Sequence, residues 1–392
     1  MRFIKDSKEE TVVNNFIAIL FTFICITALL IVRVALFYHE SGDYLMFHKL
    51  WIEAFRGMSF IEGLGTKVGN YNPPYMYILN IIARINVSDL VLMKVVSVFF
   101  DIVLAFFVMK IVSLKTDSRN MQISALILTL AVPTITLNSS MWGQCDSIYS
   151  AFAVGSVYFG MRGKSKLTYV FAALAVSFKL QAAFIFPVIA VFAFTGKIRF
   201  RDCYMFFIVY IAALLPALIA GMSFNDAFLV YFGQATTYTR LNLNIVNIWR
   251  FVGNVSIENF ITAGLYLAGT AVLSLLYFTY VHRERLKDNI DFVRLSYLFA
   301  VIIPFLLPKM HDRYYFMADV LSIAVFYYDK KRWYVPVVTV FCSYLSYAYF
   351  LMNGIEMVDF RLAAIALFII IVIVLRDYVT SLYYKTEDNC LI

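Results

Sequence analysis

Carboxylates and cations gather in polar segments between long apolar stretches of this sequence. The first such segment, residues 38–87, carries Asp43 near its start, with Glu40 three positions earlier. The last of them places three cationic candidates within five positions, beside one carboxylate: Lys309, His311, Arg313 and Asp312. Such groups either cap helix ends and pair with one another or form a shared site for a charged amphiphile, since a carboxylate can act as a base and cations bind anions.

The intervening polar segments add amides and aromatic side chains. Residues 141–149 include Trp142, Gln144 and Asp146. Asp146 either binds substrate hydroxyl groups or caps the next helix, and Trp142 is either an interfacial anchor or a platform for a sugar ring. The remaining candidates of this kind are Lys179, Gln181, Arg240 and Arg250.

The amino-acid composition indicates which class of protein carries these residues. Of the 392 residues, 62% are apolar and only 15% are charged, whereas soluble domains have roughly 45–50% apolar and about 25% charged residues. The mean hydropathy is +0.78. A soluble enzyme, a nucleic-acid-binding protein and a disordered chain are therefore excluded, in spite of the net charge of +8. The composition indicates a membrane protein that crosses the bilayer many times.

Apolar stretches of about 15–22 residues predict an all-α protein with about twelve transmembrane helices (range 10–13) in one integral membrane domain, residues 1–392. The expected spans are residues 15–37, 88–112, 121–138, 147–161, 167–178, 181–195, 203–221, 259–281, 292–307, 314–328, 333–351 and 361–375. The two stretches beside Lys179 are short, so bent or half-inserted helices are expected there. Within the second span, Asp101 is expected to pair with Lys94, seven positions earlier on the same helix face.

The distribution of Lys and Arg predicts the orientation. One set of connections carries roughly twice as many of these residues as the other, which is typical of the cytoplasmic side. We therefore expect a protein of the plasma membrane with both termini in the cytoplasm. The long segment 38–87 then faces outward. Its stretches 47–55 and 74–85 are expected to lie as amphipathic helices at the membrane surface, and Pro73 and Pro74 predict a rigid turn before the second helix.

Several motifs resemble one family of membrane enzymes. They are Glu-Ser-Gly-Asp-Tyr at 40–44, Asn-Tyr-Asn-Pro-Pro-Tyr at 70–75, the string 142–149, Lys-Leu-Gln at 179–181 and residues 308–315. Together they resemble the polyprenyl-phosphate-sugar-dependent glycosyltransferases of the C fold, in particular bacterial relatives of the second mannosyltransferase of GPI-anchor synthesis. One position departs from the family pattern, because Asp312 stands where a Glu is expected in a His-Glu-Arg-Tyr motif.

The resemblance implies an inverting hexosyltransferase that is similar to mannosyltransferases and acts on the outer face of the plasma membrane. It would take part in the synthesis of a cell-envelope polysaccharide. Its donor would be a polyprenyl-phosphate-linked sugar, and its acceptor a hydroxyl group of a glycan, lipid or protein. Asp43 is then the expected general base, with Glu40 as the alternate. The expected ligands of the donor phosphate are Lys309, His311 and Arg313, followed by Lys179, Arg240 and Arg250. The expected substrate-binding residues are Asp146, Gln144, Trp142, Tyr71, Asn72, Tyr75, Gln181 and Asp312.

No cofactor is expected. Segment 38–87 lacks an Asp-x-Asp pair, so a metal site built from paired carboxylates is not indicated, and the five cysteines are scattered without a metal-binding spacing. The sequence also lacks a Walker loop and a dinucleotide-binding glycine pattern. Two alternative functions remain open at this point: a transporter or flippase for a polyprenyl-linked sugar, and an outer-face polysaccharide polymerase or ligase.

Overall fold

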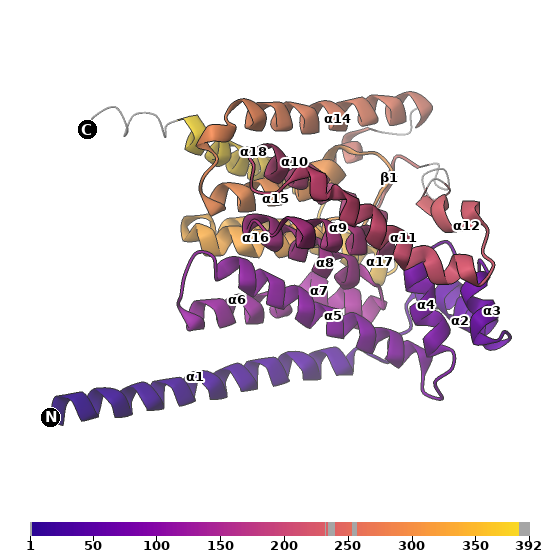
Figure 1. The fold of residues 1–392 in the computed structure, drawn as a ribbon, viewed down its shortest axis with the longest axis horizontal. Helices are drawn as coiled ribbons and strands as arrows, with labels where there is room; N and C mark the ends of the chain where they lie inside the picture. Colours follow the sequence, from indigo (N-terminus) through magenta and orange to yellow (C-terminus); the bar gives the residue numbers. More distant parts are fainter. Residues whose placement is uncertain (1, 232, 234–239, 253–256, 384–392) are drawn as a thin grey trace.

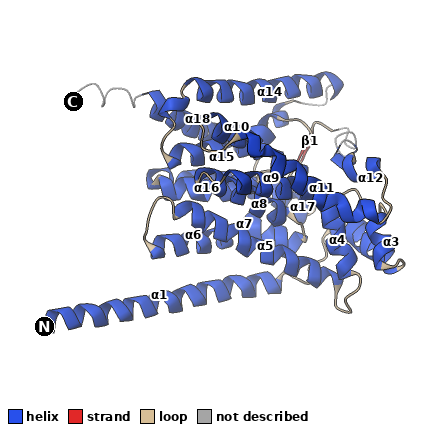
Figure 2. Cartoon of the chain, in the orientation of Figure 1, coloured by secondary structure: helices blue, strands red, loops and turns tan. Residues whose placement is uncertain are grey.

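The computed structural model describes residues 2–231, 233, 240–252 and 257–383 and is almost entirely helical (Figure 2). The apolar stretches expected to form spans are largely helical, although 121–138 and 181–195 are each divided over more than one helix. The main helices are α1 (Arg2–Ala35), α5 (Asp89–Val112), α6 (Arg119–Ala131), α8 (Asp146–Met161), α9 (Ser165–Phe178), α10 (Phe186–Phe194), α11 (Tyr204–Ile219), α14 (Ile257–Val281), α15 (Asn289–Leu306), α16 (Phe316–Tyr328), α17 (Tyr334–Leu351) and α18 (Phe360–Tyr383). The expectation of a nearly all-α fold is confirmed, and the long apolar helices are consistent with a membrane protein that crosses the bilayer several times.

Fewer of these helices than expected are long enough to cross a membrane. Within the described residues, seven are long and apolar enough, or eight if the bent pair of 119–131 and 133–142 is one span with a 55° bend. Crossing the hydrocarbon core takes about 20 helical residues, whereas α8 has 16, α9 has 14 and α16 has 13. These short helices are largely buried among the others, so hydrophobicity alone does not separate them from true spans.

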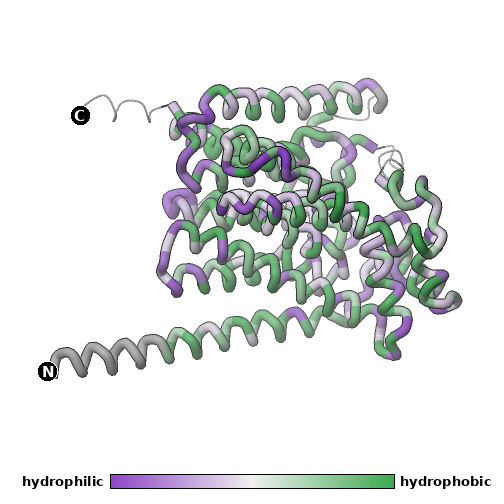
Figure 3. Tube along the Cα trace, in the orientation of Figure 1, coloured by the Kyte–Doolittle hydropathy of each residue, from purple (hydrophilic) through white to green (hydrophobic). Residues whose placement is uncertain are grey.

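The long helices lie side by side in a stack, with α1 on one flank and α14 on the other (Figure 1). Only 6% of the apolar part of α1 and 17% of that of α14 is buried. Hydrophobic residues prevail along the coloured part of α1 (Figure 3), and the exposed large hydrophobic side chains include Phe21 and Phe23 of α1 and Leu265 and Leu273 of α14. Such flanks suit contact with lipid chains. The interior is packed closely: a Cβ atom on Gly160 of α8 would lie 2.3 Å from the ring of Phe192.

The connections at one end of the stack carry the elements of the site. The first of them contains η1 (Tyr44–His48), a single π-helical turn, followed by α2 (Lys49–Arg56), α3 (Phe60–Gly65) and α4 (Pro73–Ile82). The stretches expected to be helical, 47–55 and 74–85, correspond largely to α2 and α4. Pro73 and Pro74 are the first two residues of α4 rather than a turn before it, because proline fits the first turn of a helix. The amino end of α1 and the carboxyl end of α18 lie at the opposite end of the stack (Figure 1). Both helix ends therefore lie at the same end of the stack, and the expected cytoplasmic location of the termini stays a prediction.

Shorter elements connect the main helices. They are α7 (Pro133–Thr136), η2 (Leu137–Trp142), η3 (Leu180–Ile185), η4 (Phe200–Cys203), α12 (Phe224–Phe228), β1 (Asn242–Leu243), η5 (Ile248–Phe251), η6 (Arg283–Arg285), β2 (Met310–His311) and η7 (Lys330–Arg332). The two strands pair in parallel, with Asn242 opposite Met310 and Leu243 opposite His311.

The buried ion pair of α5 differs from the expected one. Asp101 pairs with Arg33 of α1, at 3.3 Å from its Nε, and accepts hydrogen bonds from Ser139 and Ser147. Lys94 instead donates to the carbonyl groups of residues 36, 37 and 39, just beyond the end of α1. The expected pair of Lys94 with Asp101 is wrong, because unpaired carbonyl groups after a helix attract a cation.

The Arg33–Asp101 pair predicts a large loss of stability when only one partner is removed. Both side chains are fully buried, so we expect Arg33→Met to lower the free energy of unfolding by about 3–5 kcal/mol, since it leaves a buried charge unpaired. The double variant Arg33→Met/Asp101→Asn should recover much of this loss. Thermal unfolding of the purified protein in detergent measures both effects.

The exposed pair of Arg361 with Asp359 provides the matched control. Breaking it by Arg361→Ala should leave the unfolding temperature nearly unchanged, because exposed ion pairs contribute little to stability. An equal loss in the buried and the exposed variants would contradict a structural role for the Arg33–Asp101 pair.

Candidate active site

A cavity of about 580 Å³ lies at the end of the stack that carries α2 and α4. Residues from every polar segment identified in the sequence line it. The predicted site residues among them are Asp43, Tyr71, Gln144, Lys179, Gln181, Lys309, His311, Asp312 and Arg313. Segments separated by up to 270 positions therefore contribute to one wall of polar groups.

Asp43 lies immediately before the π turn η1, and its carboxylate is held from three sides. One oxygen, Oδ2, accepts hydrogen bonds from Trp142 Nε1 at 2.9 Å, from Gln144 Nε2 at 2.7 Å and from Arg313 Nη1 at 3.4 Å. Gly143 between the first two donors has φ +77°, a conformation that glycine adopts without steric cost. This turn directs both neighbouring side chains to Asp43, whose own side chain is 16% exposed.

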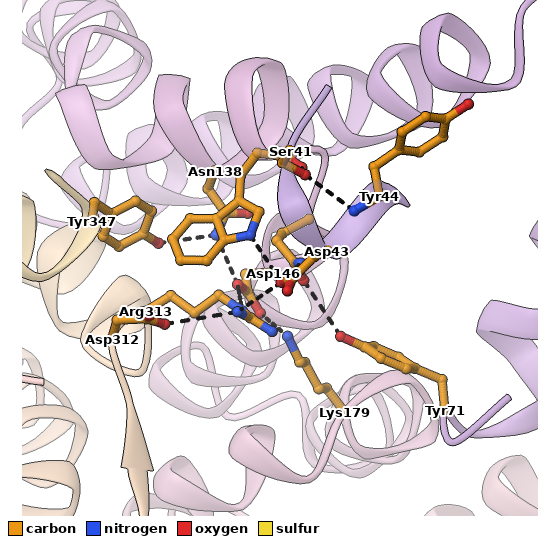
Figure 4. Close-up of polar contacts among 12 residues, drawn as sticks. Ser41, Asp43, Tyr44, Tyr71, Asn138, Asp146, Lys179, Asp312, Arg313 and Tyr347 are labelled. Carbon is orange, nitrogen blue, oxygen red and sulfur yellow. Dashed lines mark hydrogen bonds and ion pairs between the residues drawn. The ribbon is translucent and has the colours of Figure 1, made fainter. Parts of the chain in front are cut away.

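The guanidinium of Arg313 joins three carboxylates. It lies 3.4 Å from Asp43, 3.3 Å from Asp146 and 3.8 Å from Asp312, and it covers the indole ring of Trp142 at 5.1 Å (Figure 4). Burial disfavours the charged form of Arg313, but the acidic groups around it outweigh burial and raise its pKa. The side chain therefore remains a cation at the centre of the site.

Lys179 supplies the second cation of the wall. Its ammonium group pairs with Asp146, the first residue of α8, where the helix dipole also favours a negative charge. Burial acts against the charged amine, yet the adjacent Asp146 carboxylate raises the pKa of Lys179. Asn138 donates a further hydrogen bond of 2.7 Å to Asp146 and one of 2.9 Å to Tyr347. This carboxylate is thus a fixed counter-charge.

The strand pair β1–β2 positions the last polar segment. The N–H of Lys309 donates to the carbonyl of Leu241 at 2.7 Å, and that of Asp312 to the carbonyl of Leu243 at 3.0 Å. Lys309 itself has φ +60°, which is uncommon for a residue with a side chain. Backbone hydrogen bonds on both sides hold this conformation and keep Lys309 and His311 in the cavity wall.

Two members of this segment are not charged in the way that their residue types suggest. Burial, together with the nearby cations, lowers the pKa of His311 to about 3, so its ring is neutral and can act as a hydrogen-bond donor but not as a cation. Burial also raises the pKa of Asp312 to about 7. The Oδ1 atom of Asp312 has no hydrogen-bond partner within the described residues.

Four predicted substrate-binding residues lie behind the cavity wall. They are Trp142, Asp146, Asn72 and Tyr75, each at most 4% exposed and none of them lining the cavity. Trp142 stacks on Phe350 with ring centroids 4.1 Å apart, so it is neither an interfacial anchor nor an open sugar platform. Asn72 donates to the carbonyl of Ser177 at 3.0 Å. Direct substrate contact does not fit this burial, and these residues position others.

Three further candidates lie away from the cavity. Glu40 is exposed in the connection before η1, so it does not reach the face of Asp43. Arg240 is exposed and is absent from the cavity wall. Arg250, at η5, is directed toward α18, where it covers the ring of Phe360 at 4.4 Å in a separate surface hollow.

The cavity also contains residues that sequence reasoning missed. His48, Trp51 and Phe47 follow Asp43 on η1 and α2 and line the cavity, as do Ile261 and Leu265 of α14. His48 was detectable as one of only four histidines and as a neighbour of Asp43. The π turn that directs His48 into the cavity has no sequence signature, so its position could not be predicted. The sequence likewise does not distinguish Ile261 and Leu265 of α14 from apolar residues that face lipid.

The structure is thus a nearly all-helical stack with several helices long and apolar enough to cross a membrane, consistent with a multi-pass membrane protein, and with a polar cavity at one end. Comparison of the sequence with protein-family models and with curated proteins finds no match.

The raised pKa of Asp312 predicts a pH dependence of stability. The folded protein holds this proton up to about pH 7, whereas the unfolded chain releases it near pH 3.8. The contribution of Asp312 to stability is therefore present below pH 3.8, falls as the pH rises to about 7, and is absent above that. In Asp312→Asn, which cannot titrate here, the difference in unfolding temperature between pH 5 and pH 8 should be smaller than in the wild type. An unchanged difference would show that Asp312 is not the titrating group.

Proposed function

We propose that the protein is an inverting glycosyltransferase, which moves a hexose such as mannose from a polyprenyl-phosphate donor to a hydroxyl group of an acceptor. The observation that carries this proposal is that the Asp43 carboxylate, which pairs with Arg313, and the Lys179 ammonium, which pairs with Asp146, lie in the wall of one cavity. A base and cations within one cavity are what this transfer needs. The resemblance of the motifs around the same residues adds independent support.

The chemistry assigns one role to each kind of group. The acceptor hydroxyl gives its proton to the Asp43 carboxylate while its oxygen forms a bond to the anomeric carbon of the sugar. The bond between that carbon and the phosphate oxygen breaks, and the electron pair leaves with the polyprenyl phosphate. Because the base and the leaving group stand on opposite faces of the sugar, the anomeric configuration inverts. Trp142 and Gln144 hold the base in place.

The cations of the cavity stabilise the departing phosphate in this proposal. Arg313 and Lys179 already have carboxylate partners, so they supply a positive field that is fixed before the substrate binds. Lys309 lies in the same wall at the β1–β2 pair and is the candidate for direct contact with the phosphate. His311, being neutral, donates a hydrogen bond instead.

The apolar side of the cavity supports a lipid-linked donor. Ile261 and Leu265 of α14 line it together with Phe184 and Leu307, and Leu265 is 56% exposed. Since α14 is a largely exposed, apolar helix at a flank of the stack (Figure 1), we propose that the prenyl chain of a donor reaches the phosphate site from the bilayer along it without crossing water. The proposed location is the plasma membrane, with the cavity facing outward and the termini in the cytoplasm.

Asp43→Asn tests the base directly. Loss of general base catalysis typically costs about 10²–10⁴-fold in rate, so we expect a decrease of that size in the consumption of a short-chain polyprenyl-phosphate sugar by the purified protein. Glu40→Gln, an exposed acid of the same segment, should retain the wild-type rate. Near-normal transfer by a correctly inserted Asp43→Asn protein would contradict the assignment. Binding of the donor without turnover by the wild type would favour the transporter.

We further propose that transfer needs no metal ion. Within the described residues, no group of three or more His, Cys, Asp or Glu side chains is placed to hold one, and Asp43, Asp146 and Asp312 are each paired with Arg313. Excess EDTA should therefore leave the rate of donor consumption unchanged. Loss of activity in EDTA that is restored by a divalent cation would contradict this.

A further inference from the structure

The two sides of the cavity differ in chemistry. Its far side, described above, carries cations and the apolar residues of α14. The side formed by η1, α2 and the turn before α4 is aromatic and uncharged, with Phe47, His48, Trp51, Asn70 and Tyr71. A chain of contacts joins the two sides, because Tyr71 donates to Gln144 at 3.4 Å, Gln144 donates to Asp43, and Asp43 pairs with Arg313. Asp43 therefore stands at the border between them.

His48 is a buried polar group of the aromatic side with poorly satisfied hydrogen bonding. It is only 2% exposed, and within the described residues its ring nitrogens form no hydrogen bond of good geometry, although the backbone of Asp43 lies close to the ring. Burial lowers the pKa of this ring to about 4, so the ring is neutral and offers one donor and one acceptor. A buried polar group that lacks a well-formed hydrogen bond is costly. Since His48 lines the cavity, a hydroxyl group of a bound molecule can supply such a bond.

Trp51 provides a flat apolar surface next to this histidine. Its ring lies 5.3 Å from that of His48 and 5.8 Å from that of Tyr71, both edge-on. Gly69 packs against the indole so closely that a Cβ atom there would lie 2.8 Å from Trp51 Cε2. The indole is therefore held in position while it remains part of the cavity wall.

We propose that this aromatic side, formed by Phe47, His48, Trp51 and Tyr71, binds a sugar ring of the acceptor, so that the acceptor of the reaction is a saccharide. A pyranose combines an apolar C–H face, which packs on an aromatic ring, with hydroxyl groups at its edge, which match a neutral imidazole and the Asn70 amide. The binding of a sugar ring here does not depend on the proposed function, but the assignment of that sugar as the acceptor rests on it. The nucleophilic hydroxyl must lie beside the base, and His48 follows Asp43 by five residues on the same turn.

The alternative acceptors fit this side less well. A lipid alcohol brings a single hydroxyl group, which must lie at Asp43 to react, so it offers no further hydroxyl group to His48, and its chain would favour the apolar side at α14 instead. A serine or threonine side chain of a protein brings one hydroxyl group and lacks the further hydroxyl groups that a sugar ring carries around its edge. The following test distinguishes the saccharide from these two classes of acceptor.

Calorimetric titration of the full chain in lipid nanodiscs tests the proposal without turnover. The ligands are mannotriose, maltotriose, cellotriose and chitotriose, compared with decanol and a Ser/Thr-rich decapeptide. We expect at least one trisaccharide to bind, and Trp51→Ala and His48→Gln each to weaken its binding about tenfold or more, the equivalent of one lost stacking contact or hydrogen bond. Trp51→Phe should retain most of the affinity.

Two variants separate a specific effect from a loss of fold. Gly69→Ala displaces the indole without removing it and should also weaken trisaccharide binding, whereas Trp333→Ala, an exposed tryptophan of another connection, should leave it unchanged. Binding of short-chain polyprenyl phosphate should be unaffected in Trp51→Ala, and with an active donor this variant should raise the KM for the acceptor more than it lowers kcat.

The outcomes for the two proposals are distinguishable. If no trisaccharide binds, or if binding is insensitive to Trp51 and His48, the saccharide subsite is wrong even when donor consumption is observed. If binding depends on both residues but no donor is consumed, the saccharide subsite is supported and the proposed transferase activity is contradicted. Transfer to decanol or to the peptide alone would also overturn the saccharide acceptor.

Discussion

The pairing of one buried guanidinium with three carboxylates is the constraint on which the site depends. Arg313 meets Asp43 from the first connection, Asp146 from the start of α8 and Asp312 from its own segment. A charge in a site this closed to water is tolerated only when it is paired and hydrogen-bonded. The helices around it must therefore bring these segments to the same place, and any sequence that keeps Arg313 must keep its partners.

This constraint also explains how a rigid site can be built between helices in a membrane. The carboxylate of Asp43 takes its orientation from Trp142, which is itself locked by stacking on Phe350. The carboxylate of Asp146 takes its orientation from Asn138, which the broken helix α7–η2 carries toward the cavity. Charges that are fixed before a substrate binds need no reorganisation during a reaction. The short, buried helices are the elements that end at the cavity and supply these groups.

Sequence reasoning predicted the helices, the surface pieces α2 and α4, and most of the charged residues of the cavity, because hydrophobic length and clustered charge are local signals. It could not predict which charges pair. Lys94 and Asp101 share a helix face, yet Asp101 pairs with Arg33 of α1 and Lys94 binds carbonyl groups just beyond the end of that helix, since pairing depends on tertiary packing. Arg250 resembled a phosphate ligand by type, but η5 turns it toward α18. The burial of Trp142 and the inward turn of His48 likewise arise from contacts between distant segments.

The anomeric configuration of the product tests the central claim most directly. A donor with a defined configuration at the anomeric carbon is incubated with the purified protein and a trisaccharide acceptor, and the product linkage is determined by NMR. A single carboxylate base opposite a leaving phosphate predicts complete inversion, together with release of one polyprenyl phosphate per bond formed. Retention of configuration, or an unchanged donor bound in the cavity, would contradict the account.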